Sequence, residues 1–198
     1  VAGVFACDPK IIPSAKKHEY ITYDELMELA SMGAKVVHSR AVEIAKKFNV
    51  ALYCASTFSE ERGTYVVNAL PEWLEQPVVM GVTMDKNQRK FTISPMPGGQ
   101  RAQVHLFEAL ASNNINLDMI SIVKDNGYTY LTFTVVEGAS ERVREVVEEV
   151  LSQYGEHRLI EDDEVAKVTA VGVGMESSPG VAARFFAALD KEGISLLG

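Results

Sequence analysis

Apolar residues recur at helical spacing in the first quarter of the chain. Thr22 followed three residues later by Glu25 forms a capping-box pattern, which predicts a helix that begins there and ends at Gly33. Ser39 is placed to cap a second helix that continues to residue 48. The apolar stripes expected to face a core are Leu26, Leu29 and Ala30 in the first helix and Val42, Ala45 and Phe48 in the second.

The pattern changes after these helices. Residues 50–54 form a short apolar run that predicts a strand, and residues 56–63 are polar and loop-like. Pro71 and Pro77 bracket a linker that contains Trp73, the only tryptophan.

From Lys90 onward, alternating runs and turn signals follow in a regular order. Strands are expected at 91–93, 115–119, 131–135 and 157–160, with one helix after Pro97-Gly98 and another that Ser140 caps. The tripeptide 125–127, Asp-Asn-Gly, is a hairpin turn signal. This β-α-β-β-α-β order is ferredoxin-like and predicts an antiparallel sheet with both helices on one face. The acidic run 161–164 is expected to be a solvated loop.

Both predicted helices carry an apolar face. The expected buried residues are Val104, Phe107, Leu110 and Ala111 in the first helix, and Val143, Val146, Val147, Val150, Leu151 and Tyr154 in the second.

The same pattern then restarts. The matching segments are Lys90-Phe91-Thr92 with Lys167-Val168-Thr169, Pro97-Gly98 with Pro179-Gly180, Phe107-Glu108-Ala109-Leu110 with Phe186-Ala187-Ala188-Leu189, and Ile115-Asn116-Leu117 with Ile194-Ser195-Leu196. The last two matches share one offset of 79 residues. An internal repeat is therefore favoured over two unrelated β-α-β starts.

The start of each repeated helix suits a small amino-acid ligand. The first turn after Pro-Gly presents free N–H groups and the positive end of the helix dipole, which together favour an α-carboxylate. A carboxylate such as Asp118 can meet an α-ammonium, although Asp118 taken alone fits equally well as a residue that keeps an edge strand soluble.

The amino-acid composition limits the classes of binding partner that the chain is expected to have. The 198 residues are 47% apolar and 23% charged with a net charge of −8, and no Lys/Arg stripe is present, so a nucleic-acid surface is disfavoured. Cys7 and Cys54 are expected to be buried, reduced thiols, which fits the cytoplasm. No run of 18 apolar residues suggests a membrane span, and both ends of the sequence resemble interior segments of a longer chain.

Three segments near the start form a further pattern. They are Gly3-Val4-Phe5 with Asp8-Pro9-Lys10, then Gly33-Ala34-Lys35-Val36-Val37-His38, and then Ala41-Val42-Glu43-Ile44-Ala45-Lys46-Lys47-Phe48-Asn49-Val50. These segments resemble the aspartokinase family, and the repeats resemble that family's paired ACT modules. The resemblance implies an α+β fold in which the end of an amino-acid-kinase α/β domain precedes ferredoxin-like ACT modules, the second of them truncated.

The resemblance implies transfer of the ATP γ-phosphate, with Mg²⁺, to the β-carboxylate of L-aspartate, and feedback control by lysine, threonine or both. The positions it assigns to the nucleotide are Phe5, Lys10, Lys35 and Val36. The positions it assigns to the effector are Met96, Pro97, Gly98, Gly99, Asn116, Leu117, Asp118, Val181, Ala182, Ser195 and Leu196. Pairing of ACT modules further implies a homodimer or higher oligomer.

Several residues depart from the family's pattern. Phe5 stands where a tyrosine is usual, Ala2 where an acid is common, and Ser39 where a proline follows the histidine. The segment 94–102 is about three residues longer than the usual ligand loop and lacks the aspartate expected before Pro-Gly.

The expected domains are the kinase part at 1–60, a linker with a leading strand at 61–87, the first ACT module at 88–162 and the start of the second at 163–198. The family's catalytic phosphate loop and aspartate-binding residues are not found in these residues, so no catalytic residue and no metal site is assigned, and the chain alone is expected to be inactive. The alternatives are a non-catalytic amino-acid-binding subunit of the same enzyme and an ACT module attached to another enzyme.

Overall fold

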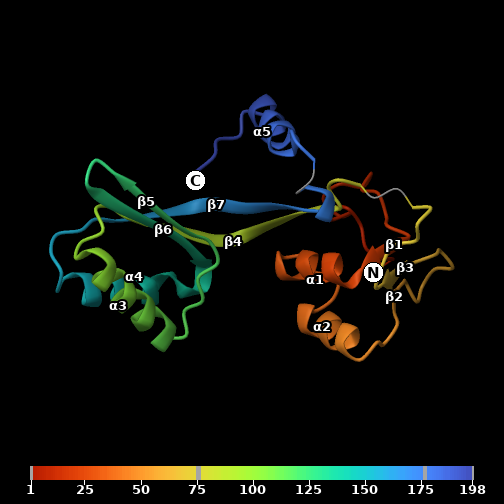
Figure 1. The fold of residues 1–198 in the computed structure, drawn as a ribbon, viewed down its shortest axis with the longest axis horizontal. Coiled ribbons are helices and arrows are strands. Elements are labelled where there is room, and N and C mark those ends of the chain that lie inside the picture. Colours follow the sequence, from red (N-terminus) through yellow and green to blue (C-terminus); the bar gives the residue numbers. More distant parts are fainter. Residues whose placement is uncertain (1, 75–76, 176–177, 198) are drawn as a thin grey trace. The chain divides into compact units, whose positions relative to one another are not determined.

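Two 13-residue strands, β4 (Gly81–Ile93) and β7 (Leu159–Val171), are shared between the two compact units of the chain. A computed structural model describes residues 2–74, 77–175 and 178–197. The first unit comprises Val1–Asp85 and Val168–Gly198, and the second unit comprises Lys86–Lys167. The long strands can be followed through the labels of Figure 1. Within the described residues, no helix combines the length and apolar character needed to cross a membrane.

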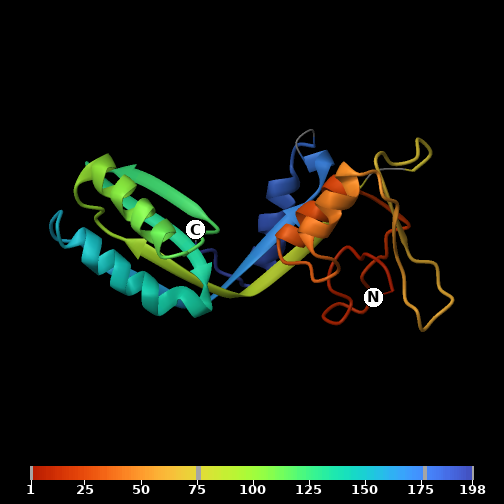
Figure 2. The ribbon, with the colours of Figure 1, turned by 90° about the horizontal axis from the view of Figure 1, so that it is seen from below.

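The second unit has the predicted ferredoxin-like order. After β4 come α3 (Gly99–Ser112), β5 (Ile120–Asp125), β6 (Tyr128–Val136), the short 3-10 turn η1 (Glu137–Ala139), α4 (Ser140–Leu151) and β7. The sheet order is β5-β6-β4-β7, and β6 pairs antiparallel with both β4 and β5. Helices α3 and α4 lie side by side on one face of this sheet (Figures 1 and 2). The hairpin turn is confirmed, because Asn126 and Gly127 both have positive φ between the paired strands.

The core of the second unit fills the space between that sheet face and the two helices. Phe91 and Phe133 are fully buried and stack with their ring centroids 5.7 Å apart. The predicted face of α4 is confirmed, since all five of its aliphatic residues are buried and Tyr154 packs against them.

Helix α3 is rotated relative to the predicted stripe. Leu110 is buried as expected and Phe107 is half-buried, but Val104 is 49% exposed. The buried face is formed by Ala102, Leu106 and Leu110, at i, i+4 and i+8. The prediction for Val104 and Ala111 was therefore wrong, because apolar residues cover two overlapping faces of this helix and packing selects the other one.

The second strand begins later than its alternation suggested. Strand β5 starts at Ile120, and residues 115–119 are not part of it. Main-chain bonds from Asp118 N to Thr134 O and from Thr134 N to Met119 O lead the chain into the strand. Helix α4 also has a different cap, because Ser140 is its first residue and its hydroxyl donates to Glu137 O.

The acidic run 161–164 is part of strand β7 and not the predicted loop. Glu161 accepts a hydrogen bond from Arg144 Nε at 2.7 Å, and Asp162 pairs with Lys90 Nζ at 2.9 Å. These two cations pair with two of the four carboxylates of the run. The predicted fourth strand and the first strand of the repeat are thus one continuous strand.

The N-terminal part of the first unit has a three-stranded sheet and the helices α1 and α2. Its elements are β1 (Tyr20–Thr22), α1 (Tyr23–Ser31), α2 (Ser39–Lys47), β2 (Leu52–Cys54) and β3 (Thr64–Val67). In the order β1-β3-β2, β3 runs parallel to β1 and antiparallel to β2. Strands β1 and β3 were not predicted.

The predicted capping box of α1 is confirmed, with Thr22 and Glu25 each satisfying the other's main-chain N–H. Helix α2 begins at Ser39, but His38 is its cap and accepts from Arg40 N. Phe48 is 67% exposed, so the stripe ends at Ala45. Cys7 and Cys54 are free and half-buried, and burial raises the pKa of the Cys54 thiol.

The repeat is visible in the helices that open each module. After β7 and the 3-10 turn η2 (Val173–Met175), helix α5 (Val181–Lys191) starts behind Gly180 in the left-handed conformation, as α3 starts behind Gly98. The two helices also end alike, with Ile115 N bonded to Leu110 O and Ile194 N bonded to Leu189 O. However, α3 has 14 residues and α5 has 11. The extra residues predicted for the loop therefore lengthen the helix, by about 4.5 Å at 1.5 Å per residue.

The rotation of α3 gives a matched pair of substitutions. We expect Leu106→Ala to lower the free energy of unfolding by about 2–5 kcal/mol, because it leaves a cavity, whereas Val104→Ala should change it by less than about 0.5 kcal/mol. Calorimetry of the two variants measures this difference. The opposite ranking would mean that the helix presents the originally predicted face.

Candidate nucleotide and amino-acid sites

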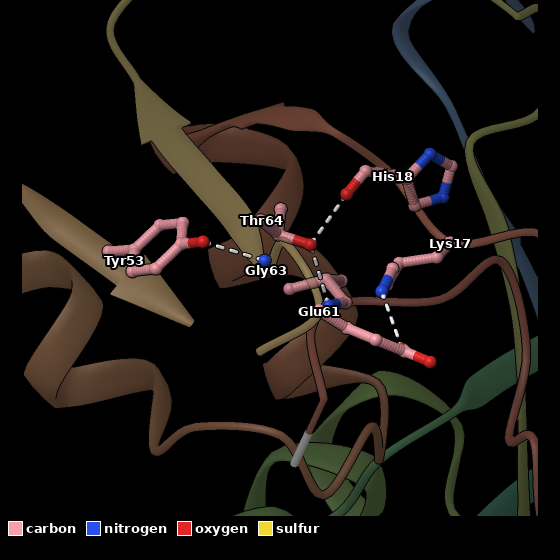
Figure 3. Close-up of polar contacts among 7 residues, drawn as sticks. Lys17, His18, Tyr53, Glu61, Gly63 and Thr64 are labelled. Carbon is pink, nitrogen blue, oxygen red and sulfur yellow. Dashed lines mark hydrogen bonds and ion pairs between the residues drawn. The ribbon is translucent and has the colours of Figure 1, made fainter. Parts of the chain in front are cut away.

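The segment around Phe5 is held by a buried threonine. Thr64 Oγ1 accepts a hydrogen bond from Val4 N at 2.8 Å and donates to His18 O at 2.6 Å, so it joins two stretches of main chain (Figure 3). Phe5 itself is half-buried and forms an isolated antiparallel bridge with Lys17. No sequence signal identified Thr64, since it lies in the segment 61–87 that was predicted as a linker with a leading strand.

Gly63, next to Thr64, packs closely against the main chain of β2. Gly63 N donates to Tyr53 Oη at 2.7 Å (Figure 3), and a Cβ on Gly63 would stand 2.1 Å from Cys54 O. Lys17 pairs with Glu61 at 3.3 Å. Burial lowers the pKa of the neighbouring His18 below its ordinary value, and a hydrogen bond with the main chain of Met80 partly opposes this shift.

The predicted nucleotide lysines both extend from loops. Lys10 lies in a turn in which its own main-chain N–H donates to Asp8 Oδ1 at 2.9 Å. Lys35 follows the end of α1, where Gly33 has a φ of +105° and Ala34 N donates to Leu29 O. Both lysines are exposed, and among the described residues neither ammonium group has an ion-pair partner.

Val36, the fourth predicted nucleotide residue, is half-buried against the core of the first unit. All four residues thus belong to the first unit, and no hydrogen bond or ion pair among the described residues joins their side chains to one another. Their common role stays a prediction.

The Pro97-Gly98 turn of the second unit is covered by an aromatic ring. Gly98 and Gly99 both have positive φ, 68° and 60°, and a Cβ on Gly98 would lie 2.5 Å from Tyr154 Cδ1. Tyr154 Oη is 3.0 Å from His105 Nδ1 on α3. Met96 is buried beneath the turn, and its N–H donates to Thr129 O. The turn is therefore held by Tyr154, which follows α4 and bonds to His105 of α3, and by the main-chain bond of Met96 to β6.

A groove of about 530 Å³ lies beside helix α3. Its lining residues on α3 and after α4 are Arg101, Val104, His105, Glu108, Gln153 and Tyr154. Sequence patterns did not indicate this groove, since it joins segments about 50 residues apart.

The other predicted effector residues of the first module lie before β5. Asp118 forms an ion pair with Lys167 Nζ, and the lysine side chain is only 11% exposed. Asn116 is exposed, and Leu117 packs against the core of the second unit. The Asp118 carboxylate is thus already paired with a cation, which the sequence did not predict.

The predicted effector residues of the repeat belong to the first unit. Val181 is buried at the start of α5, whereas Ala182, Ser195 and Leu196 are exposed. A Cβ on Gly180 would meet no atom of the described residues within 4 Å, so among these residues this turn is open where the Gly98 turn is covered.

Together, the βαββαβ unit, its repeated helix start and the preceding α/β segment define an ACT-type regulatory fold attached to part of an amino acid kinase domain. The amino acid kinase family model matches residues 1–56, and the ACT domain model matches residues 168–197. The predicted boundaries inside the chain remain predictions.

Named relatives agree with this class. The chain is 37% identical to the aspartate kinase of Pseudomonas putida over 99% of its own length and 48% of that protein. Its structure resembles that of Clostridium acetobutylicum aspartate kinase with a TM-score of 0.81, at 21% identity, over 98% of this chain and 45% of the other. A structure of aspartokinase alpha and beta subunits matches at 37% identity and a TM-score of 0.55, over 61% of this chain and 79% of that chain. The chain belongs to the aspartokinase family, and it spans about half the length of the curated relatives it matches.

Substitutions of Gly98 and Gly99 distinguish the cost of a left-handed backbone from the cost of a steric clash. Gly99→Ala should lower the free energy of unfolding by about 1–2 kcal/mol through its left-handed backbone, because no atom lies near its Cβ position. Gly98→Ala should lower it by a further ~1–3 kcal/mol, because the new methyl group meets the Tyr154 ring. In a Tyr154→Ala background the extra cost of Gly98→Ala in thermal unfolding should become smaller but not vanish, because the new methyl group also stands 2.8 Å from Ala102 Cβ. An extra cost that Tyr154→Ala leaves unchanged would show that Tyr154 does not contribute to it.

Proposed function

We propose that a protein of the relatives' length that contains this chain is a cytoplasmic aspartate kinase, which transfers the γ-phosphate of ATP to the β-carboxylate of L-aspartate. The observation that carries the proposal is 37% identity to a named aspartate kinase across 99% of the chain, in both the kinase part and the regulatory part. Aspartokinase III of E. coli, whose fold this chain shares at 22% identity, was solved with aspartate and ADP.

Lys10 and Lys35 would meet the nucleotide phosphates. Both ammonium groups are exposed and without an ion-pair partner among the described residues, and lysine is a compact charge suited to phosphate oxygens. Phe5 and the main chain of Val36 would contact the nucleotide nearby. Mg²⁺ would arrive with the phosphates, since the assigned side chains are cations and apolar groups and not the oxygen ligands that Mg²⁺ prefers.

The ACT region would sense lysine, threonine or both. The N–H groups at the start of α3 or α5 suit the effector's carboxylate, and Asp118 would meet its ammonium in exchange for, or beside, the ion pair with Lys167. E. coli aspartokinase III was also solved with lysine and aspartate, and its fold resembles this one with a TM-score of 0.70. The open turn at Gly180 and the covered turn at Gly98 would give the two modules unequal access.

Self-association would complete the regulatory region. Every residue of the edge strand β5 is exposed, and Ile120, Ile122 and Val123 are among them. An apolar, unpaired edge of this kind is normally covered, which favours a homodimer or higher oligomer through the ACT modules.

A non-catalytic regulatory chain is the second candidate. The regulatory subunit of aspartate kinase from Thermus thermophilus matches 59% of this chain at 30% identity. Residues 1–56 match the amino acid kinase family, and a regulatory chain needs little kinase sequence. The kinase is therefore the favoured function. A hydroxamate assay on the protein of full length decides between them: the kinase forms aspartyl hydroxamate only with both ATP and aspartate, and the regulatory subunit forms none.

Lys35→Ala in this full-length protein should lower kcat/KM for ATP by about tenfold to 150-fold, because a lost charged contact costs about 1.5–3 kcal/mol. Lys47→Ala, at the exposed end of α2, is the matched control and should leave the kinetics unchanged. Steady-state rates at varied ATP measure both. Equal kinetics in the two variants would reduce Lys35 to a surface lysine.

Asp118→Ala should weaken inhibition by lysine or threonine at least about tenfold while leaving the uninhibited rate within about twofold, because the carboxylate would pair with the effector's ammonium. Asp125→Ala, an exposed carboxylate at the end of β5, is the control and should not change inhibition. Inhibition curves for both amino acids provide the measurement. Curves of wild type and Asp118→Ala that overlay would refute the role of Asp118.

A further inference from the structure

Thr83 is a buried polar residue on β4 that bonds to the end of another element. Only 7% of Thr83 is exposed, and its Oγ1 donates to the carbonyl oxygen of Met32 at 2.8 Å. Met32 is the C-cap residue of α1. Carbonyl groups at a helix C-terminus have no partner within the helix, so the threonine hydroxyl satisfies a group that would otherwise be unpaired.

The residues that follow Met32 are the nucleotide loop, 33–36. The loop is tied back to α1 by the bond from Ala34 N to Leu29 O at 2.9 Å. On its other side, Asp85 Cβ lies 3.7 Å from the position that a Cβ on Gly33 would take. Lys35 has no ion-pair partner among the described residues, so its position depends on the main chain that Thr83 and Leu29 hold.

The same short stretch of β4 holds the other nucleotide segment. Val82 N donates to Ala6 O at 2.7 Å, and Ala6 directly follows Phe5. Gly81 permits this approach, since a Cβ there would stand 3.1 Å from Ala6 O and 2.9 Å from Leu29 Cδ2. Residues 81–83 thus join two segments that lie far apart in the sequence.

We propose that Thr83 is a positioning residue of the nucleotide site. Its hydroxyl fixes the Met32 carbonyl and thereby sets the place of Lys35, while Thr83 itself touches no nucleotide. This inference rests on the proposed role of loop 33–36, and it adds a residue outside both family motifs.

Thr83→Val tests the role, because valine keeps the shape and removes the hydroxyl. In the full-length enzyme we expect the KM and the equilibrium dissociation constant for ATP to rise roughly three- to tenfold, as for one lost hydrogen bond. The kcat and the KM for aspartate should stay within about twofold. Thr83→Ser restores the donor and should return ATP binding to the wild-type value. Thr92→Val removes a hydroxyl on the same strand that pairs with Thr132 Oγ1, and it should leave ATP binding unchanged.

Unchanged ATP affinity in Thr83→Val would overturn the inference, as would a Thr83→Ser enzyme that behaves like the valine variant. A Thr83→Val enzyme in which kcat falls and both KM values rise by similar factors would also overturn the inference, since damage to every constant marks a purely structural role. Equilibrium dialysis with ATP alone separates this inference from the proposed activity. A wild-type protein that binds ATP without phosphorylating aspartate would refute only the activity.

Discussion

A single strand, β4, is the constraint on which both units depend. Its first residues hold the first unit, through Val82 bonded to Ala6 and Thr83 bonded to Met32. Its last residues, Phe91 and Ile93, are fully buried in the core of the second unit. A change of register in this strand would turn Phe91 and Ile93 away from the core of the second unit, because side chains alternate faces along a strand, and it would break the bonds of Val82 and Thr83 to the first unit.

Strand β7 lies next to β4 in the sheet and holds the chain where β4 begins. Met80 N donates to Val171 O at 2.7 Å, just before β4 begins and where β7 ends. Gly172 is needed at this join, since a Cβ there would stand 2.3 Å from Val78 O. The acidic run of β7 is tolerated inside the strand because Arg144 and Lys90 pair with it.

The sequence predicted the order of elements well because each helix and strand of the second unit carries its own periodicity. Three features depended on distant partners and could not be predicted. The start of β5 is set by where β6 offers hydrogen bonds, the rotation of α3 by packing against α4, and the acidic strand by its cations. Strand β1 was hidden because its three residues merge with the helical pattern that follows.

The candidate nucleotide residues came from family motifs, whereas the residues that hold them in place had no sequence signal. Thr64, with two hydrogen bonds of its hydroxyl group to main-chain atoms, and Thr83, with one, hold these segments in a way that strand propensity alone cannot reveal. Likewise, Tyr154 covers Gly98 from a segment more than 50 residues away. These contacts arise only once the chain is folded.

Hydrogen exchange of the full-length protein with and without ATP tests the shared strand most directly. If β4 holds the nucleotide segments, ATP should slow exchange both at the amides of 34–36 and at Val82, whose N–H bonds to Ala6. Protection at 34–36 with unchanged exchange at Val82 would contradict the coupling of the two segments through β4. No protection at either place would contradict the nucleotide assignment itself.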